Sequence, residues 1–217
     1  MDSGYKIYTD ILRNRILEKV KEKKIYNETQ FGFREGRGTI DAVQVVIEKK
    51  EKVYIFFVDL KAAFDNLDTG ELFRILRKKG IKDLLSYRVM KLYEETSSKI
   101  KIGNKGIGEI WNEKGVRQEC KLSADMFNIY MSDLEEELKE IRDGGLVVGR
   151  KKIWSISYAD DIALVAINKE EMRRMLKKLE KYLGKKKLQL NTEKLKIMIL
   201  GEKRGRKRKE ERNMKWY

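Results

Sequence analysis

The stretch Tyr158–Val165, YADDIALV, places two adjacent aspartates in the middle of an otherwise apolar run. A buried carboxylate is costly unless it is paired, hydrogen-bonded or bound to a metal ion, and two neighbouring carboxylates also repel each other. Apolar segments flank the pair, with IWSIS before it and IALVAI after it. The pattern therefore predicts a β-hairpin whose tight turn presents Asp160 and Asp161 at one edge of a sheet.

A third carboxylate, Asp59, directly follows the largely apolar segment KVYIFFV. Such a run favours a strand that is central in its sheet. If that strand lies beside the hairpin, Asp59 joins Asp160 and Asp161, and cations are needed to offset their repulsion. Carboxylate oxygens suit hard divalent cations, and two Mg²⁺ ions about 3.5–4 Å apart can clamp an in-line phosphoryl transfer. The sequence therefore predicts a site for two Mg²⁺ ions, with Mn²⁺ as the alternative ion.

Composition narrows the class of protein and of partner. The chain has 217 residues, and its 50 Lys and Arg against 35 Asp and Glu give a formal net charge of +15. This excess of positive charge favours nucleic acid as the binding partner, with an anionic membrane surface as the second candidate. The alternative is a basic surface that is simply solvated and binds no partner. The single cysteine, Cys120, excludes an internal disulfide, and the absence of histidine excludes histidine catalysis.

The chain contains neither an apolar run of about 18 residues nor a secretory signal at its start, MDSGYKIYTD. We therefore expect an intracellular protein with no membrane partner and no disulfide partner.

Helix and strand signals are interleaved along the chain and predict a mixed α+β fold. The segment SADMFNIYMSDLEEELKEI predicts one continuous amphipathic helix over 123–141. A further helix begins with the capping pair Asn168 and Glu171 and is expected to end at Gly184. The other expected elements are helices over 5–24, 39–50, 69–79 and 83–95, a hairpin over 98–116 and a strand over 188–200.

Six segments of the chain resemble motifs of the reverse transcriptase domain of non-LTR retrotransposons and, more distantly, of group II intron-type reverse transcriptases. YKIYTDILRNRI and QFGFREGRGTIDAV are similar to fingers segments of that family, and FVDLKAAFDNLDTGELFRIL is similar to its first palm motif. GVRQECKLSADMFNIYMSDL is similar to the motif before the long palm helix, YADD to the family hallmark, and LQLNTEKLKIMIL to the lysine-bearing motif. Their shared order and spacing carry the resemblance.

The resemblance implies an α+β fold: a right-hand polymerase palm with partial fingers, in which an antiparallel sheet is backed by helices. Residues 1–52 would form the partial fingers, 53–200 the palm, and 201–217 a basic tail that we expect to be disordered because it is poor in apolar residues. The family's upstream fingers segment, primer grip and thumb have no counterpart among the matched motifs.

The resemblance also implies a reaction. Asp59, Asp160 and Asp161 match the metal-binding catalytic triad, and the main-chain carbonyl of Leu60 would assist them. The family is an RNA-directed DNA polymerase, in which the 3′-hydroxyl of a DNA primer attacks the α-phosphate of a deoxynucleoside triphosphate opposite an RNA template. Two Mg²⁺ ions assist and pyrophosphate leaves.

Four further matches concern substrate binding. Phe64 matches the aromatic residue under the sugar of the incoming nucleotide, where a flat ring leaves no room for a 2′-hydroxyl. Gln118 matches a glutamine that lines the nucleotide site, and Arg37 lies in a glycine-rich loop that would meet template or phosphate. Either Lys194 or Lys196 matches a lysine beside the leaving pyrophosphate, which a cation would stabilise.

The sequence departs from the family pattern at Glu119, Lys121 and Ala124, where the family has glycine, proline and proline. Two other interpretations stay open: a catalytically inactive nucleic-acid-binding remnant, and the palm of an RNA-dependent RNA polymerase. The latter usually has glycine before the aspartate pair and no aromatic residue at the position of Phe64. The tail segment GRKRKEER is either a nuclear import signal or a solvated basic run.

Overall fold

The computed structural model describes residues 3–34, 36, 52–81, 84–94, 97–102, 105–111, 114–117, 120–142, 144–148 and 150–201. The chain divides into two compact units that alternate along the sequence. A helical unit comprises Met1–Glu28, Leu60–Asp133 and Leu183–Gln189, and a sheet unit comprises Thr29–Asp59, Leu134–Tyr182 and Leu190–Tyr217. The helix expected over 39–50 and most of the tail over 201–217 lie outside the described residues.

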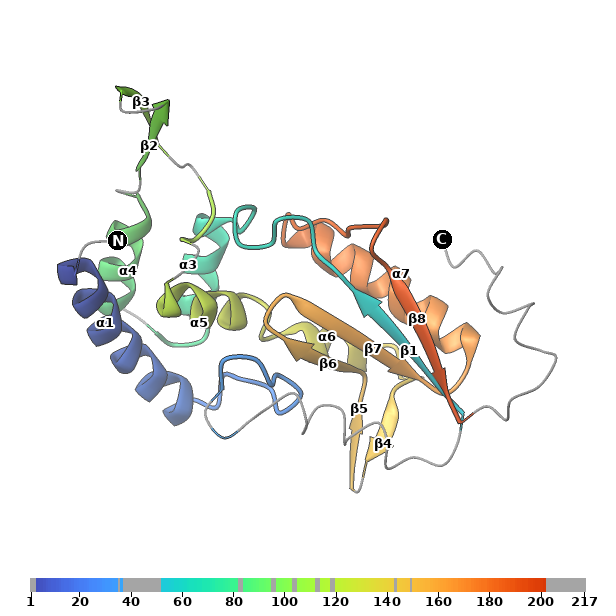
Figure 1. Ribbon diagram of the computed structural model, residues 1–217. Helices are drawn as coiled ribbons and strands as arrows, with labels where there is room; N and C mark the ends of the chain where they lie inside the picture. Colours follow the sequence, from blue (N-terminus) through green and yellow to red (C-terminus); the bar gives the residue numbers. More distant parts are fainter. Residues whose placement is uncertain are drawn as a thin grey trace. The chain divides into compact units, whose positions relative to one another are not determined.

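The sheet unit is built on four antiparallel strands in the order β6-β7-β1-β8 (Figure 1). These strands are β1 (Val53–Val58), β6 (Ser155–Tyr158), β7 (Asp161–Ala166) and β8 (Lys196–Leu200). The predicted central position of β1 is confirmed, and so is the hairpin of β6 and β7 around the YADD turn. A second, short hairpin of β4 (Leu146–Val148) and β5 (Lys151–Ile153) was not predicted from the sequence.

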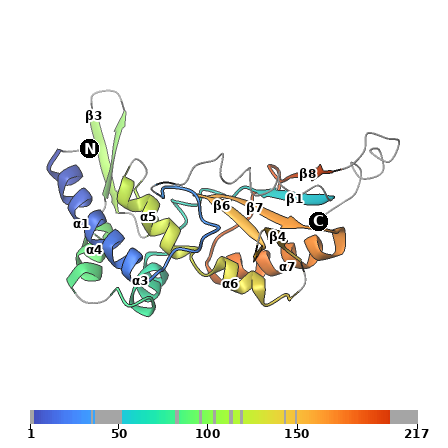
Figure 2. The same ribbon diagram turned by 90° about the horizontal axis from the view of Figure 1, so that it is seen from below.

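The two faces of this sheet are covered differently. Phe56 pairs with Leu164, and side chains alternate across a strand, so both lie on one face, where both are buried. Helices α6 (Leu134–Lys139) and α7 (Lys169–Lys185) cover one face in Figure 2. On the opposite face Phe57 and Met198 are 40% and 45% exposed. The sheet therefore has one helix-covered face and one face that is partly open to solvent.

A buried glutamate fastens α6 to the sheet. Glu135 is only 3% exposed, and its carboxylate accepts hydrogen bonds from the backbone N–H groups of Trp154 and Ser155 at 2.9 and 3.1 Å and from the Ser155 hydroxyl at 2.7 Å. Burial raises the pKa of Glu135, and these hydrogen bonds oppose the shift. Because Ser155 pairs with Leu164, the contact assigns α6 to the face that carries Leu164 and Phe56.

The helical unit contains α1 (Ser3–Glu22), α3 (Thr69–Lys78), α4 (Leu84–Glu94) and α5 (Lys121–Tyr130), with the predicted hairpin present as β2 (Ser97–Ile102) and β3 (Lys105–Trp111). Asp68 caps α3 by accepting a hydrogen bond from the Glu71 N–H. Gly80, with φ of 80°, follows the last turn of α3 as predicted. Among the described residues, no helix is both long enough and apolar enough to cross a bilayer.

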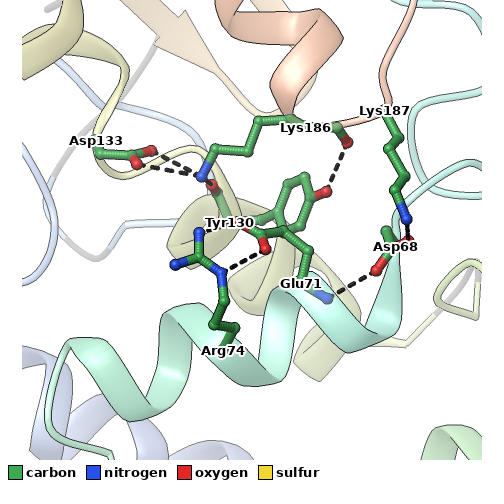
Figure 3. A network of polar contacts seen from close by, with 7 residues as sticks. All are labelled: Asp68, Glu71, Arg74, Tyr130, Asp133, Lys186 and Lys187. Carbon is green, nitrogen blue, oxygen red and sulfur yellow. Dashed lines mark hydrogen bonds and ion pairs between the residues drawn. The ribbon is translucent and has the colours of Figure 1, made fainter.

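The single helix expected over 123–141 is wrong: α5 ends at Tyr130, and α6 begins at Leu134. The main-chain carbonyl of Tyr130 accepts a hydrogen bond from the Lys186 ammonium at 3.1 Å, in place of the next helical N–H (Figure 3). Lys186 is also ion-paired with Asp133 at 3.0 Å, and its own carbonyl accepts from the Tyr130 hydroxyl at 2.6 Å. A cation that is distant in sequence therefore ends α5.

The end of α7 also differs from the expectation. The helix continues through Gly184 to Lys185, and Lys187 takes the left-handed conformation, with φ of 56°. The Lys187 ammonium is ion-paired with Asp68 (Figure 3). Glycine adopts the left-handed conformation more readily than lysine does. We therefore attribute the left-handed conformation of Lys187, rather than of Gly184, to this ion pair.

Replacing Glu135 with Ala should lower the free energy of unfolding by about 2–5 kcal/mol, since two buried N–H groups lose their acceptor at about 1–3 kcal/mol each. Chemical denaturation monitored by circular dichroism would measure the change. Glu136→Ala, one position along α6 at an exposed site, is the matched control and should change stability by less than about 0.5 kcal/mol. Equal effects of the two substitutions would contradict the anchoring role of Glu135.

Candidate active site

Asp59 lies directly after β1, where segment 190–195 holds it. Its main-chain carbonyl accepts a hydrogen bond from the Asn191 N–H at 2.9 Å. Its carboxylate accepts a second bond from the Asn191 side-chain amide at 2.8 Å and lies 3.5 Å from the Lys194 ammonium. Asn191 therefore fixes both the backbone and the side chain of Asp59.

The other two aspartates lie at the turn between β6 and β7. Tyr158 pairs with Asp161, so Ala159 and Asp160 form the two-residue loop. Ala159 has φ of 58°, a left-handed conformation that costs a residue with a Cβ about 1–2 kcal/mol. Backbone strain of this kind persists only where the surroundings impose it, and it is concentrated at functional sites.

Strand register brings the carboxylates together. Val58 on β1 pairs with Ile162 on β7, so continuing this antiparallel register by one residue places Asp59 opposite Asp161. Directly opposed residues in such a pair have Cβ atoms about 4.5–5.5 Å apart. The sequence predicted that Asp59 would join the YADD turn only if the two strands were neighbours, and β1 and β7 are neighbours.

The pKa of Asp161 reflects how close the three carboxylates lie to one another. Its pKa is raised first by partial burial and then by the negative charges of Asp160 and Asp59, while Lys194 lowers it. Three carboxylates therefore share one small region of the sheet unit, with Lys194 as the cation that offsets part of their repulsion.

The donor chemistry fits a hard divalent cation, since carboxylate oxygens are its preferred ligands. In the arrangement that the structure describes, no three Asp, Glu or Cys side chains are already grouped as a metal-binding set. The Asp59 carboxylate is instead engaged by Asn191 and Lys194. Binding of a divalent cation would therefore have to displace Lys194 from Asp59.

The two candidate lysines differ in position. Lys194 lies beside Asp59 and acts on Asp161, and its side chain is 67% exposed. Lys196 is the first residue of β8, pairs with Phe57 and is exposed. Lys194 is therefore the candidate whose ammonium lies beside the carboxylates. The sequence alone did not distinguish it from Lys196.

Asn191 was missed at the sequence level. It stands in the lysine-bearing segment LQLNTEKLKIMIL, three residues before Lys194. The available signal was an asparagine, with its short amide side chain, inside a segment already matched to a functional motif. Its partner, Asp59, is 132 residues away in the chain, so local sequence could not identify the contact.

The segment Thr29–Gly32 supports the YADD turn from the other side of β6. Gln30 forms a parallel bridge with Ser157, the Phe31 N–H bonds to the Ser157 carbonyl at 2.8 Å, and the Ser157 N–H bonds to the Thr29 carbonyl at 2.9 Å. A Cβ added to Gly32 would lie 2.2 Å from the Ala159 nitrogen. Only glycine allows this close backbone approach, immediately beside the strained Ala159.

Two of the residues predicted to act at the nucleotide site, Leu60 and Phe64, lie in the helical unit rather than in the sheet unit. Leu60 is buried, and the Phe64 ring stacks on Phe127 with centroids 5.1 Å apart. Gly115, with φ of 89°, packs so tightly against Asp65 that an added Cβ would lie 2.8 Å from the Asp65 carbonyl oxygen. Gln118 and Arg37 lie outside the described residues.

Comparisons with known proteins agree on one family. The family model described as "Reverse transcriptase (RNA-dependent DNA polymerase)" matches residues 1–216. A retrovirus-related Pol polyprotein from the type-1 retrotransposable element R2 of Nasonia vitripennis is 27% identical over 152 residues, covering 70% of this chain and 15% of that protein. A probable RNA-directed DNA polymerase from transposon BS of Drosophila melanogaster is 26% identical over 173 residues, covering 76% of this chain and 18% of that protein.

Solved structures resemble the chain in fold. Telomerase from Candida tropicalis in its apo form superposes with a TM-score of 0.66 at 14% identity, covering 90% of this chain and 38% of that one. Telomerase from Candida albicans, solved in complex with a fragment of telomeric RNA, gives a TM-score of 0.66 at 15% identity, covering 88% of this chain and 35% of that one. The chain thus spans less than a fifth of the two curated relatives and little more than a third of these two telomerases.

Replacing Gly32 with Ala should destabilise the protein by about 1–3 kcal/mol, the usual cost of overpacking, because backbone atoms at Ala159 must move. Thermal denaturation would measure the loss. Gly184→Ala is the control, since no atom lies within 4 Å of a Cβ added there. If Gly32→Ala were as stable as the parent protein, Gly32 would not be in close contact with the turn.

Replacing Asp161 with Asn should raise the melting temperature at neutral pH without added metal. A carboxyl group whose pKa is raised on folding binds its proton more tightly in the folded chain, so its ionisation destabilises the fold. This penalty is complete above the raised pKa and vanishes below the ordinary value of 3.8. The gain should therefore shrink as the pH falls through 4. A gain that is independent of pH would contradict the assignment.

Proposed function

Because the chain belongs to the reverse transcriptase (RNA-dependent DNA polymerase) family, we propose that Asp59, Asp160 and Asp161 are its catalytic carboxylates. The predicted resemblance to non-LTR retrotransposon reverse transcriptases and the right-hand polymerase fold are both confirmed. The proposed reaction is attack of a DNA primer 3′-hydroxyl on the α-phosphate of a deoxynucleoside triphosphate opposite an RNA template.

The observation that carries this proposal is the register that places Asp59 opposite Asp161 beside the YADD turn. The pKa of Asp161 is raised first by partial burial and then by the neighbouring carboxylates, and such a cluster has no evident structural benefit. Perturbed ionisable groups of this kind are typical of functional sites. The cluster therefore supports a cation-dependent catalytic role rather than a purely structural one.

We propose that the cation is Mg²⁺ and that Asp59, Asp160 and Asp161 hold it, with the main-chain carbonyl of Leu60 assisting. Two such ions would activate the attacking hydroxyl and stabilise the leaving oxygen. The chain itself positions Asp59, because Asn191 donates one hydrogen bond to its carboxylate and another to its main-chain carbonyl.

Lys194 is proposed to stabilise the leaving pyrophosphate once a divalent cation has displaced it from Asp59. Its exposed ammonium can leave the 3.5 Å ion pair at little cost, since such pairs contribute about 0–1 kcal/mol. Phe64 would select against a 2′-hydroxyl, Gln118 would line the nucleotide site, and Arg37 would meet template or phosphate, as the family resemblance implies.

Substituting Asp160 with Asn should weaken Mn²⁺ binding at least tenfold, because one of three oxygen donors loses its charge. Electron paramagnetic resonance of free Mn²⁺ would measure the affinity, with Asp10→Asn as the charge-matched control. Binding that is the same in both variants would refute the proposed metal site.

Primer extension on an RNA template tests the activity itself. We expect Mg²⁺-dependent incorporation of deoxynucleotides that Asp160→Asn reduces by two or more orders of magnitude. Lys194→Ala should leave Mn²⁺ affinity equal to or above that of the parent protein but should slow extension about 10- to 100-fold. Mn²⁺ binding without any extension by the parent protein would instead favour the non-catalytic nucleic-acid-binding alternative.

A further inference from the structure

A pocket of about 290 Å³ lies in the helical unit, and its lining residues are different from those assigned a role in the reaction above. Helices α1 and α4 and the segment before α5 line it, contributing Tyr5, Tyr8, Arg88, Lys91, Leu92 and Arg117. All of these residues belong to the same compact unit. The described lining thus combines two aromatic rings, three cations and one aliphatic side chain, and none of these described residues is acidic.

The aromatic side of the pocket comes from one turn of α1. Tyr5 and Tyr8 are three residues apart, so they lie on neighbouring positions of the same helix face. Arg117 lies over the Tyr5 ring, 4.7 Å from its centroid, whereas Tyr8 is 41% exposed. Tyr8 therefore offers an aromatic surface on which another planar group can stack.

The cationic side of the pocket comes from α4 and from Arg117. Arg88 and Lys91 are also three residues apart and share one helix face. Lys91 has an acidic neighbour in Glu94 at 3.2 Å, but both side chains are about half exposed, so this pair is weak. Three cations around a small pocket favour an anionic ligand.

One polar atom at the pocket has no partner among the described residues. The Tyr5 hydroxyl is buried and makes no hydrogen bond, which is unusual because buried hydroxyl groups are nearly always paired. Burial is the largest cause of the raised pKa of Tyr5, so the group remains a neutral donor at physiological pH. A ligand atom that accepts a hydrogen bond would satisfy it.

We propose that this pocket binds one nucleotide of a single-stranded nucleic acid, with the base stacked on Tyr8 and its phosphate held by Arg88 and Arg117. Stacking on a tyrosine requires a base that is not already paired and stacked, and the volume suits one nucleotide rather than a base pair. The net charge of +15 favours a strand over a free nucleotide, because neighbouring phosphates add electrostatic attraction. The residues proposed for this site are different from those proposed to bind the metal ion.

Fluorescence anisotropy with a short labelled oligouridylate at near-physiological salt tests the proposal. Tyr8→Ala should weaken binding about fivefold or more, the effect of losing one stacked base, without changing the salt dependence. Arg88→Ala should weaken binding and lower the slope of log affinity against log salt by about 0.7, the value for one lost phosphate contact on a single strand.

Two controls match these substitutions. Tyr87→Ala removes a tyrosine of α4 that is 50% exposed and does not line the pocket, and Arg15→Ala removes an exposed arginine of α1. Each should change the affinity less than twofold. If Tyr8→Ala weakened binding no more than Tyr87→Ala did, or Arg88→Ala no more than Arg15→Ala, the proposal would be overturned.

A second readout locates the strand directly. An oligonucleotide carrying 4-thiouridine should crosslink on irradiation to a peptide containing Tyr5 or Tyr8, as identified by mass spectrometry, and Tyr8→Ala should remove most of that product. Crosslinks confined to other peptides would refute the site. Tyr8→Ala should leave Mn²⁺ affinity unchanged, so failure of one proposal is distinguishable from failure of the other.

Discussion

The pairing of β1 with β7 is the constraint on which the candidate site depends. Its register sets Asp59 opposite Asp161 at the point where the sheet meets the YADD turn. The arrangement brings like charges together, and after partial burial these charges are the next cause of the raised pKa of Asp161. Hydrophobic burial stabilises this pairing against the repulsion, because Phe56, Ile55, Leu164 and Val165 are all buried. The sheet core therefore supports a charge arrangement that would not persist in isolation.

Three neighbouring features hold this arrangement in place, and each acts on a different part of it. Asn191 bonds to both the backbone and the side chain of Asp59, Lys194 supplies a compensating positive charge, and Gly32 lies against the backbone of Ala159. Asn191 and Lys194 belong to one segment near the C-terminal end of the described chain, whereas Gly32 lies far from them in the sequence. Such convergence is what pre-organisation of a catalytic centre requires, since the carboxylates must be held close together before a cation offsets their charge.

The helical unit combines a polar network with an unassigned pocket. Lys186 ends α5 and pairs with Asp133, and Lys187 pairs with the residue that caps α3 (Figure 3). Desolvation lowers the pKa of Lys186, whereas Asp133 raises it, so the ion pair offsets part of the cost of burying this ammonium. Elsewhere in the same unit the pocket near Tyr8 is lined by three cations and contains the Tyr5 hydroxyl, which has no hydrogen-bond partner among the described residues.

The sequence by itself determined most of the elements and the family, because both depend on local pattern. Apolar runs identified β1 and the β6–β7 hairpin, Asn168 and Glu171 identified the start of α7, and the order of the motifs indicated a reverse transcriptase. Only the tertiary structure decided which groups meet. The separation of Lys194 from Lys196, the role of Asn191 and the break between α5 and α6 all depend on contacts across 56 to 135 residues of chain. Hydrophobic periodicity reports which side of an element is buried, but it carries no information about which distant donor or cation will reach a given carboxylate or carbonyl.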